Sequence, residues 1–301
     1  MAPIPATFSQ ALNSTLPVRR LGMACLVIGS LAIAMAAAHP ADRSRAQLVA
    51  IHDIQGPGGT SPRTGDWVSL RGIVTGLKSN GFFVQAPAVE WDGDPSTSEG
   101  IFVYTGSSLP DAARTGNLVQ VNGRVTEYIP SADPWSLPMT EISGSPAVPL
   151  VLTGQALPPP VELTAAELSP AGGLEQLERY EGMRVRAAAL TVVGPAGGWL
   201  NEAEAWASSD GVFFGVMPDT PRPFREPGIE TPLPVPQPPC CIPRFDANPE
   251  RLRVDGDGLA GTSARDLASG VLVTGLTGPR DYADRSYTLL PQSGWVAGAN
   301  P

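Results

Sequence analysis

Apolar and polar residues alternate along most of the chain after residue 46, as half-buried β-strands require. In residues 66–77, Val68, Leu70 and Val74 lie on one face of the expected strand, and a glycine-rich turn at residues 79–81 follows as a hairpin signal. The pattern predicts five strands, over residues 66–77, 81–86, 100–105, 117–128 and 139–143.

The gap between the third and fourth expected strands holds residues 109–115, which can form one helical turn. Five strands with a helical element in this position are the layout of an OB-type Greek-key barrel. The sequence therefore predicts an all-β chain, in which the first OB-like module covers residues 47–144.

Short motifs of this module recur in the same order further along the chain. The matched pairs are residues 65–70 with 182–185, 98–103 with 209–214, and 116–123 with 270–275. A repeat of this kind indicates two related modules in tandem. We predict a second OB-like module over residues 161–291, with strands at 183–193, 211–217, 270–276 and 287–290, a proline-rich connection at 145–160 and a tail at 292–301.

The second module differs from the first by a long segment, residues 218–269, between its second and third matched motifs. This segment is rich in proline and arginine. Loops of this length inside a compact domain are usually functional or disordered. The insertion is therefore a candidate location for a binding site.

The N-terminal residues 1–38 resemble an export signal. Arg19 and Arg20 precede an apolar run at residues 21–38, and the run ends in three alanines that suit a signal peptidase. We expect cleavage there, a secreted or periplasmic protein, and no stable membrane association afterwards. An uncleaved membrane anchor is the alternative, because the apolar run is near the shortest length that spans a bilayer.

Charge and cysteine content restrict the partners of the chain. The formal net charge is −9, so a nucleic acid can bind only through a local basic face. Outside the expected signal, the cysteines are the adjacent pair Cys240 and Cys241. Two free thiols, a strained vicinal disulfide and pairing between chains all fit this pair.

The sequence contains almost no histidine that could serve in catalysis. His52 is the single histidine inside a module, and no G-x-S-x-G nucleophile motif is present. Zinc hydrolase motifs need paired histidines, and no pair of carboxylates stands out as a glycosidase pair. We expect a structural role for His52 and assign no catalytic residue.

The acidic loop at residues 91–99 is a candidate cation site. Asp92, Asp94 and Glu99 with the intervening hydroxyls could supply oxygen ligands to Ca²⁺. The loop is not an EF-hand, because Thr97 and Val103 stand where that motif needs glycine and glutamate. A turn in which Asp side chains accept bonds from nearby backbone amides explains the same residues.

Two groups of basic and aromatic residues suggest contacts with a nucleic acid, since guanidinium groups neutralise phosphates and rings stack on bases. The alternative is that the rings pack into the barrels, Phe83 above all, while the arginines pair with Glu226, Asp246 and Glu250. The candidates are Arg222, Phe224, Arg225, Arg244 and Phe245 in the insertion, where Arg251 and Arg253 follow, and Arg71, Lys78, Phe83 and Tyr104 in the first module.

Three motifs carry a resemblance to a known family. W-D-G-D-P-S-T-S-E-G-I-F-V at 91–103, R-P-F-R-E-P-G at 222–228 and P-R-F-D-A-N-P-E-R-L-R-V-D at 243–255 occur in this order. With them, residues 47–291 resemble the non-catalytic region of large secreted bacterial nucleases, whose catalytic part belongs to the endonuclease/exonuclease/phosphatase family.

The resemblance implies OB-type modules that bind DNA or RNA weakly through its backbone. It also implies a nuclease domain, in cis or in trans, that would use Mg²⁺ and begin after about residue 291, so none of its catalytic residues is carried over to this chain. We expect an exported nucleic-acid-binding accessory region of an extracellular endonuclease. The alternative is a secreted adhesion or glycan-binding β-module, with calcium dependence if the acidic loop holds an ion.

Overall fold

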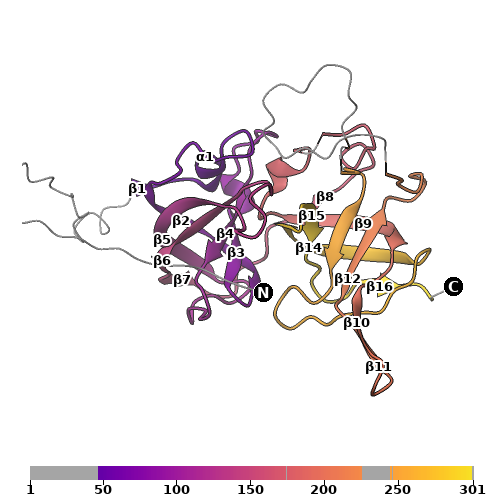
Figure 1. The fold of residues 1–301 in the computed structure, drawn as a ribbon. Coiled ribbons are helices and arrows are strands. Elements are labelled where there is room, and N and C mark those ends of the chain that lie inside the picture. The colour runs from indigo at the N-terminus through magenta and orange to yellow at the C-terminus, as the bar shows by residue number, and fades with distance from the viewer. Residues whose placement is uncertain (1–46, 174, 226–244, 246, 300–301) are drawn as a thin grey trace, which may run out of the picture. The chain divides into compact units, whose positions relative to one another are not determined.

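The computed structural model describes residues 47–173, 175–225, 245 and 247–299, and these belong to one compact unit. The described residues form two five-stranded β-barrels of mixed strand direction, as the sequence predicts (Figure 1). The expected leader at 1–38 lies outside the described residues, as do Arg244, Cys240 and Cys241.

The first barrel has the strand connectivity of an OB-fold. Neighbouring strands pair in antiparallel fashion except β4 and β6, which run parallel, and the pairing of β5 with β2 closes the barrel. All five predicted strands are confirmed, as β2 (Trp67–Lys78), β3 (Gly81–Gln85), β4 (Gly100–Tyr104), β5 (Leu118–Tyr128) and β6 (Met139–Ala147).

Short elements complete this barrel. β1 (Gln47–Leu48) pairs with β2, α1 (Ile51–Gln55) follows it, and η2 (Ala88–Glu90) lies in the loop between β3 and β4. The predicted helical turn at 109–115 was wrong. The segment forms a turn in which the Ala113 amide donates to the Pro110 carbonyl over 2.9 Å, and Ala113 packs into the core.

The second barrel repeats the connectivity of the first. Its closing pairs are β14 with β9 and the parallel pair of β13 with β15. Its strands are β9 (Arg184–Gly194), β12 (Val212–Val216), β13 (Leu252–Asp255), β14 (Leu272–Ala283) and β15 (Ser286–Leu289), with a protruding hairpin of β10 (Gly198–Asn201) and β11 (Trp206–Ser209) between the first two (Figure 1).

The matching of the second repeated motif is corrected by these pairings. Residues 98–103 lead into β4, the third strand of its barrel, whereas residues 209–214 lead into β12, the second strand of its barrel. Gly100 begins β4, Gly211 precedes β12, and both strands carry phenylalanine, so the local pattern could not tell them apart. The long segment at residues 218–269 therefore separates the second strand, β12, from the fourth, β14, and the third strand, β13, lies inside it.

The edges of the predicted modules also differ in detail. β6 extends to Ala147, and β7 (Leu150–Leu152) pairs with β5, so the extended part of the connection begins at residue 153. β8 (Val161–Glu162) pairs with β9, and η3 (Glu178–Tyr180) precedes that strand. In the expected tail, β16 (Val296–Ala297) pairs with β14. No helix among the described residues is long and apolar enough to span a bilayer.

Each barrel encloses its own apolar core. Val68, Leu70 and Val74 belong to the core of the first barrel, as their alternation predicts. Val185, Phe213 and Leu289 are among the fully buried residues of the second. A third, smaller cluster joins the barrels and consists of Phe83, Phe102, Met139, Leu259 and Leu290.

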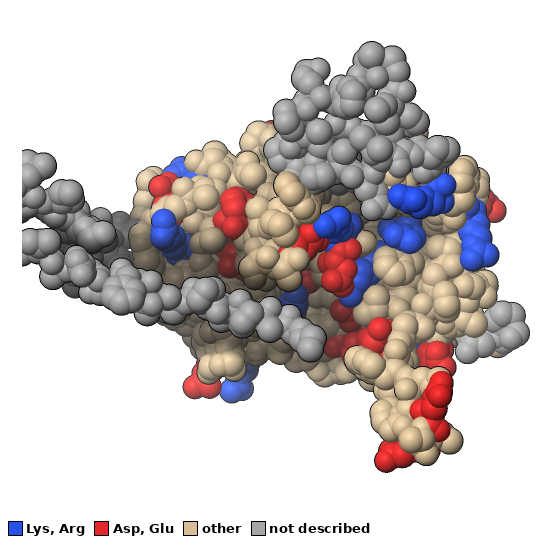
Figure 2. All heavy atoms as spheres, viewed as in Figure 1, with Lys and Arg blue, Asp and Glu red and all other residues tan. Residues whose placement is uncertain are grey.

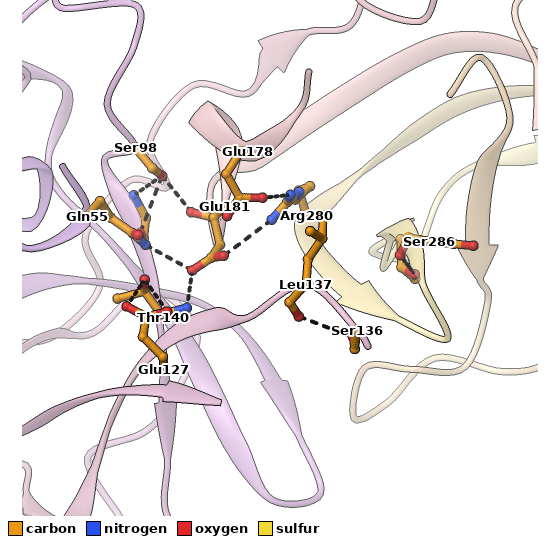
Figure 3. A network of polar contacts seen from close by, with 12 residues as sticks. Gln55, Ser98, Glu127, Ser136, Leu137, Thr140, Glu178, Glu181, Arg280 and Ser286 are labelled. Atoms are coloured by element: carbon orange, nitrogen blue, oxygen red, sulfur yellow. Dashed lines mark hydrogen bonds and ion pairs between the residues drawn. The ribbon is translucent and has the colours of Figure 1, made fainter. Parts of the chain in front are cut away.

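A buried polar network crosses the same junction (Figure 3). The carboxylate of Glu181, which precedes β9, accepts hydrogen bonds from the Thr140 amide at 2.8 Å and from Gln55 Nε2 at 3.3 Å in the first barrel. Arg280 on β14 lies 2.8 Å from Glu178 and 3.7 Å from Glu181. Burial raises the pKa of Glu181 well above its usual range, and the charge of Glu178 adds to the effect.

Candidate nucleic-acid interface

The outer face of the second and third strands is where an OB-fold usually binds its ligand. In the first barrel this face is covered by the second barrel. Phe83 on β3 and Phe102 on β4 point outward, stack with ring centroids 5.0 Å apart, and pack against Leu259 and Leu290. Phe83 is completely buried, in accord with the packing alternative, so it offers no ring to a nucleic acid.

Backbone contacts bring the covering barrel close. The Arg184 amide donates to Gln85 Oε1 at 2.9 Å, and the Ala260 amide donates to the Leu77 carbonyl at 2.8 Å. A Cβ at Gly100 would lie 2.3 Å from the Gly182 carbonyl carbon, so the two chain segments touch there. A nucleic-acid strand has no room between these surfaces.

The remaining candidates of the first barrel are scattered. Lys78 Nζ lies 2.6 Å from the buried Asp281 carboxylate and 5.3 Å from the centre of the Phe102 ring, so it belongs to the junction. Arg71 is exposed on β2 and donates to Gln120 Oε1 through two nitrogens, at 3.3 and 3.4 Å. Tyr104 is 42% exposed at the end of β4. These side chains do not form one basic and aromatic surface.

The candidates of the second barrel come together in one pocket. It has a volume of about 400 Å³ and lies beside the end of β9 at Gly194. The predicted residues Arg222, Phe224, Arg225 and Phe245 line it, together with Val193, Pro223, Asn248 and Arg251. We call this set the arginine–phenylalanine pocket.

Rings and guanidinium groups are paired in and beside this pocket. Arg251 lies 4.4 Å from the centre of the Phe214 ring on β12, and Arg225 lies 5.3 Å from that of Phe245. Burial lowers the pKa of Arg251, against the opposing charge of Glu250. Phe224 is 72% exposed, so its ring is open to a partner that stacks on it.

Two turn residues hold the loop in place. Ala247 and Asn248 have φ of 61° and 55°, and Asn248 Nδ2 donates to the Phe224 carbonyl at 3.0 Å. This bond ties the arginine-rich segment before residue 226 to the strand entry at Arg251. Arg222 has no ion-pair partner among the residues that the structure describes.

Arg253 is used differently from Arg251. It lies between β12 and β15, 8% exposed, at 3.1 Å from Asp284 and 3.5 Å from Asp255. Its charge is therefore neutralised within the barrel. Glu226 and Asp246, which the alternative pairs with the arginines, are outside the described residues.

Charge is unevenly spread over the second barrel (Figure 2). Basic side chains gather at the upper right of this view, whereas acidic side chains mark the protruding β10–β11 hairpin, which carries Glu202 and Glu204. The hairpin exposes Trp199 and Trp206, which the sequence analysis did not single out. An acidic hairpin is a poor partner for a polyanion, so the pocket is the better interface.

The acidic loop of the first barrel is organised around a histidine. His52 Nδ1 lies 3.1 Å from both oxygens of Glu99, and the ligand atoms of His52, Asp92 and Glu99 are within 4.8 Å of one another. Burial lowers the pKa of His52, but the hydrogen bond to Glu99 and its charge outweigh this effect and raise the pKa overall. His52 thus has the structural partner expected of it.

Asp94 lies apart from that group. Its carboxylate accepts bonds from the amide and the hydroxyl of Ser96, at 2.8 and 2.7 Å, and these bonds lower its pKa. Asp92 likewise accepts from the Asp94 amide at 2.8 Å, as the turn alternative predicts. A set of one nitrogen and two carboxylates suits zinc better than Ca²⁺, which prefers six to eight oxygens. Calcium binding here stays a prediction.

The fold and this site define a tandem OB-like β-protein. No known protein family matches the chain, and no curated protein matches it in sequence. Among solved structures the chain is similar to fission yeast Pot1, determined with single-stranded DNA, at 12% identity and a TM-score of 0.24, over 82% of this chain and 87% of that one. The nuclease relationship therefore stays a prediction from the sequence.

Proposed function

We propose that this protein binds single-stranded nucleic acid through the arginine–phenylalanine pocket of its second barrel. One observation carries the proposal. Arg222, Arg225 and Arg251 converge with the rings of Phe224 and Phe245 on an open surface, although the chain as a whole is acidic. The corresponding face of the first barrel is covered, so the second barrel is the module that binds.

The chemistry of the pocket suits a flexible strand. Arginines can contact successive phosphates, while the exposed Phe224 ring stacks on a base of any identity. A duplex keeps its bases stacked and offers no free base face, so it gains only the phosphate contacts. We expect weak binding with little sequence preference, for DNA or RNA alike.

The wider role that we propose follows from the sequence. The leader pattern at 1–38 supports export, and the resemblance over 47–291 supports an accessory role beside an extracellular endonuclease. In that role the barrels would hold DNA or RNA near a nuclease domain supplied in cis or in trans. Mg²⁺ would act in that domain and not in the barrels.

Removing two cations from the pocket tests the proposal. We expect the double variant Arg222→Ala with Arg225→Ala to bind a fluorescein-labelled dT15 oligonucleotide about tenfold more weakly at 0.1 M salt. The slope of log affinity against log salt should become shallower by about 0.7 for each phosphate that the variant no longer neutralises. Fluorescence anisotropy at four salt concentrations measures both quantities.

A matched control removes the same charge elsewhere. Arg114→Ala with Arg186→Ala deletes two exposed guanidinium groups outside the pocket and should leave affinity within about twofold. Equal weakening by both double variants would show general charge attraction instead of a site. An affinity that does not change with salt would also overturn the proposal.

A further inference from the structure

An open groove lies on the first barrel, where the end of β4 lies beside the middle of β6. It has a volume of about 480 Å³ and is lined by Tyr104 and Thr105 at one side and by Glu141 and Ser143 at the other. None of its lining residues is basic. It shares no lining residue with the arginine–phenylalanine pocket.

The carboxyl group of Glu141 has an unusual position in this groove. Glu141 lies on β6 and is only 5% exposed, yet no hydrogen bond to its carboxyl group is found among the described residues. Burial raises its pKa to about 7, with Lys78 acting in the opposite direction and Glu127 adding to the rise. The carboxyl oxygens are not among the fully buried unsatisfied atoms and Glu141 lines the groove, so they can take a partner there.

A second polar group in the lining also lacks a hydrogen-bond partner. Thr105 Oγ1, in the same lining, is buried without a hydrogen-bond partner among the described residues. Close by, Ser143 Oγ and Thr126 Oγ1 are 2.6 Å apart and can each accept a further bond. The Tyr104 ring, 42% exposed, supplies an apolar face beside these polar groups.

We propose that this groove binds a neutral sugar ring of a glycan. A sugar presents C–H groups to an aromatic ring and hydroxyls to a carboxyl group and to side-chain hydroxyls. A hydroxyl both donates and accepts, so it can pair with Glu141 in either protonation state. A phosphate is disfavoured, because Glu141 would repel it and no cation lines the groove to hold it.

Binding to defined hexasaccharides tests the proposal. We expect the purified protein to give saturation-transfer NMR signals with at least one of cellohexaose, maltohexaose, xylohexaose and chitohexaose. Tyr104→Ala should weaken that binding at least about tenfold, because stacking on the ring is removed. Tyr128→Ala is the control, since Tyr128 is 48% exposed on β5 of the same barrel but outside the groove, and it should have no effect.

Two changes at Glu141 separate binding from folding. Glu141→Gln keeps the hydrogen-bonding capacity and should bind the sugar within about threefold of the unchanged protein. Glu141→Leu removes the capacity without burying a charge, so it should fold normally and bind at least about tenfold more weakly. The absence of a saturation-transfer signal with all four sugars would overturn the proposal. Sugar binding by Glu141→Leu equal to that of the unchanged protein would overturn it as well.

Nucleic acid is the competing occupant. If Tyr104→Ala weakens dT15 binding as much as Arg222→Ala with Arg225→Ala does, the groove is an extension of the nucleic-acid interface and the sugar proposal is wrong. A loss of sugar binding with unchanged dT15 binding supports two independent sites. If Arg222→Ala with Arg225→Ala binds dT15 as well as the unchanged protein does, the proposed function is wrong. The sugar proposal is not affected by that result.

The protonation of Glu141 predicts how stability depends on pH. Its folded pKa of about 7 lies above its ordinary value of 4.5, so the folded protein holds a proton that the unfolded chain has lost. Stability from this group therefore falls as pH rises between those two values. The charged groups facing it are Lys78 on β2 and Glu127 on β5, and Lys78 is itself paired with Asp281 on β14.

Glu141→Gln removes that dependence. The Tm of the variant relative to the unchanged protein should therefore rise from pH 5 to pH 8 in thermal unfolding followed by circular dichroism. A Tm difference that stays constant over this range would show that the Glu141 carboxyl has an ordinary pKa. The groove would then have no protonated carboxyl group to donate a hydrogen bond to a sugar.

Discussion

Replacing Arg280 with methionine should destabilise the folded protein by about 3–5 kcal/mol. Arg280 is 1% exposed and pairs with Glu178, whose side chain is 11% exposed, and with the buried Glu181. Its guanidinium lies 4.3 Å from the centre of the Tyr287 ring. Methionine fills much of the volume but leaves the Glu178 carboxylate without its cation, and an uncompensated charge in a largely buried position is costly.

The loss should depend on the carboxyl partners of Arg280. Adding Glu178→Gln and Glu181→Gln to Arg280→Met should restore much of the stability, since a neutral network does not leave a charge buried. Urea unfolding of the unchanged protein, Arg280→Met and the triple variant measures these differences.

An exposed pair of the same type provides the control. Arg186 on β9 lies 2.9 Å from Glu162, but the two side chains are 46% and 52% exposed. Arg186→Met should cost less than about 1 kcal/mol, because water solvates the carboxylate that remains. If the Arg280 and Arg186 variants lose equal stability, the buried network does not hold the junction together.

The strands could be predicted where alternation is long and regular. β2, β5 and β9 each extend over eleven residues or more, and their core positions alternate with polar ones. β13 could not be predicted in this way. It has only four residues, Leu252–Asp255, and it follows a proline-rich and arginine-rich segment that contains no alternation. Its place in the sheet is set by β12 and β15, which are remote in sequence.

The candidate site was predictable in part for the same reason. Arg222, Phe224 and Arg225 are neighbours in the chain, so a local motif reveals them. The contact of Arg251 with Phe214 joins a strand entry to a strand thirty-seven positions earlier, and only the sheet pairing brings them together. The role of Lys78 could not be predicted from its neighbours in the sequence. Its ion-pair partner, Asp281, belongs to the other barrel, so no local motif indicates that Lys78 is already paired.

The two barrels have therefore diverged in what their outer faces do. In the first, small residues at Gly76 and Gly100 and rings at Phe83 and Phe102 make a surface that fits the second barrel closely. In the second, the equivalent strands carry Phe214, which contacts Arg251 of the arginine–phenylalanine pocket, and Arg253, which is paired within the barrel. The duplicated fold thus presents different residues at equivalent strands of the two barrels.

The close approach at Gly100 leads to the second large effect. Gly100→Ala would place a Cβ 2.3 Å from the Gly182 carbonyl carbon and from the Met183 amide nitrogen. Both are backbone atoms, so rotation of a side chain cannot relieve the clash. Gly182 also has a φ of 70°, a conformation that favours glycine. We expect a loss of about 3 kcal/mol, at the upper end of the usual cost of overpacking. In a protein of this size this corresponds to a fall in Tm of about 6–12 °C.

The manner of unfolding distinguishes a loosened junction from a damaged barrel. Calorimetry should show one transition for the unchanged protein and two for Gly100→Ala, because barrels that no longer pack against each other unfold separately. Gly59→Ala is the matched control, since the nearest atom to its added Cβ is a glutamate oxygen 4.0 Å away. It should leave Tm unchanged or slightly raised. A single, undisplaced transition for Gly100→Ala would mean that the barrels do not meet at this glycine, and the covered face of the first barrel would again be available to a ligand.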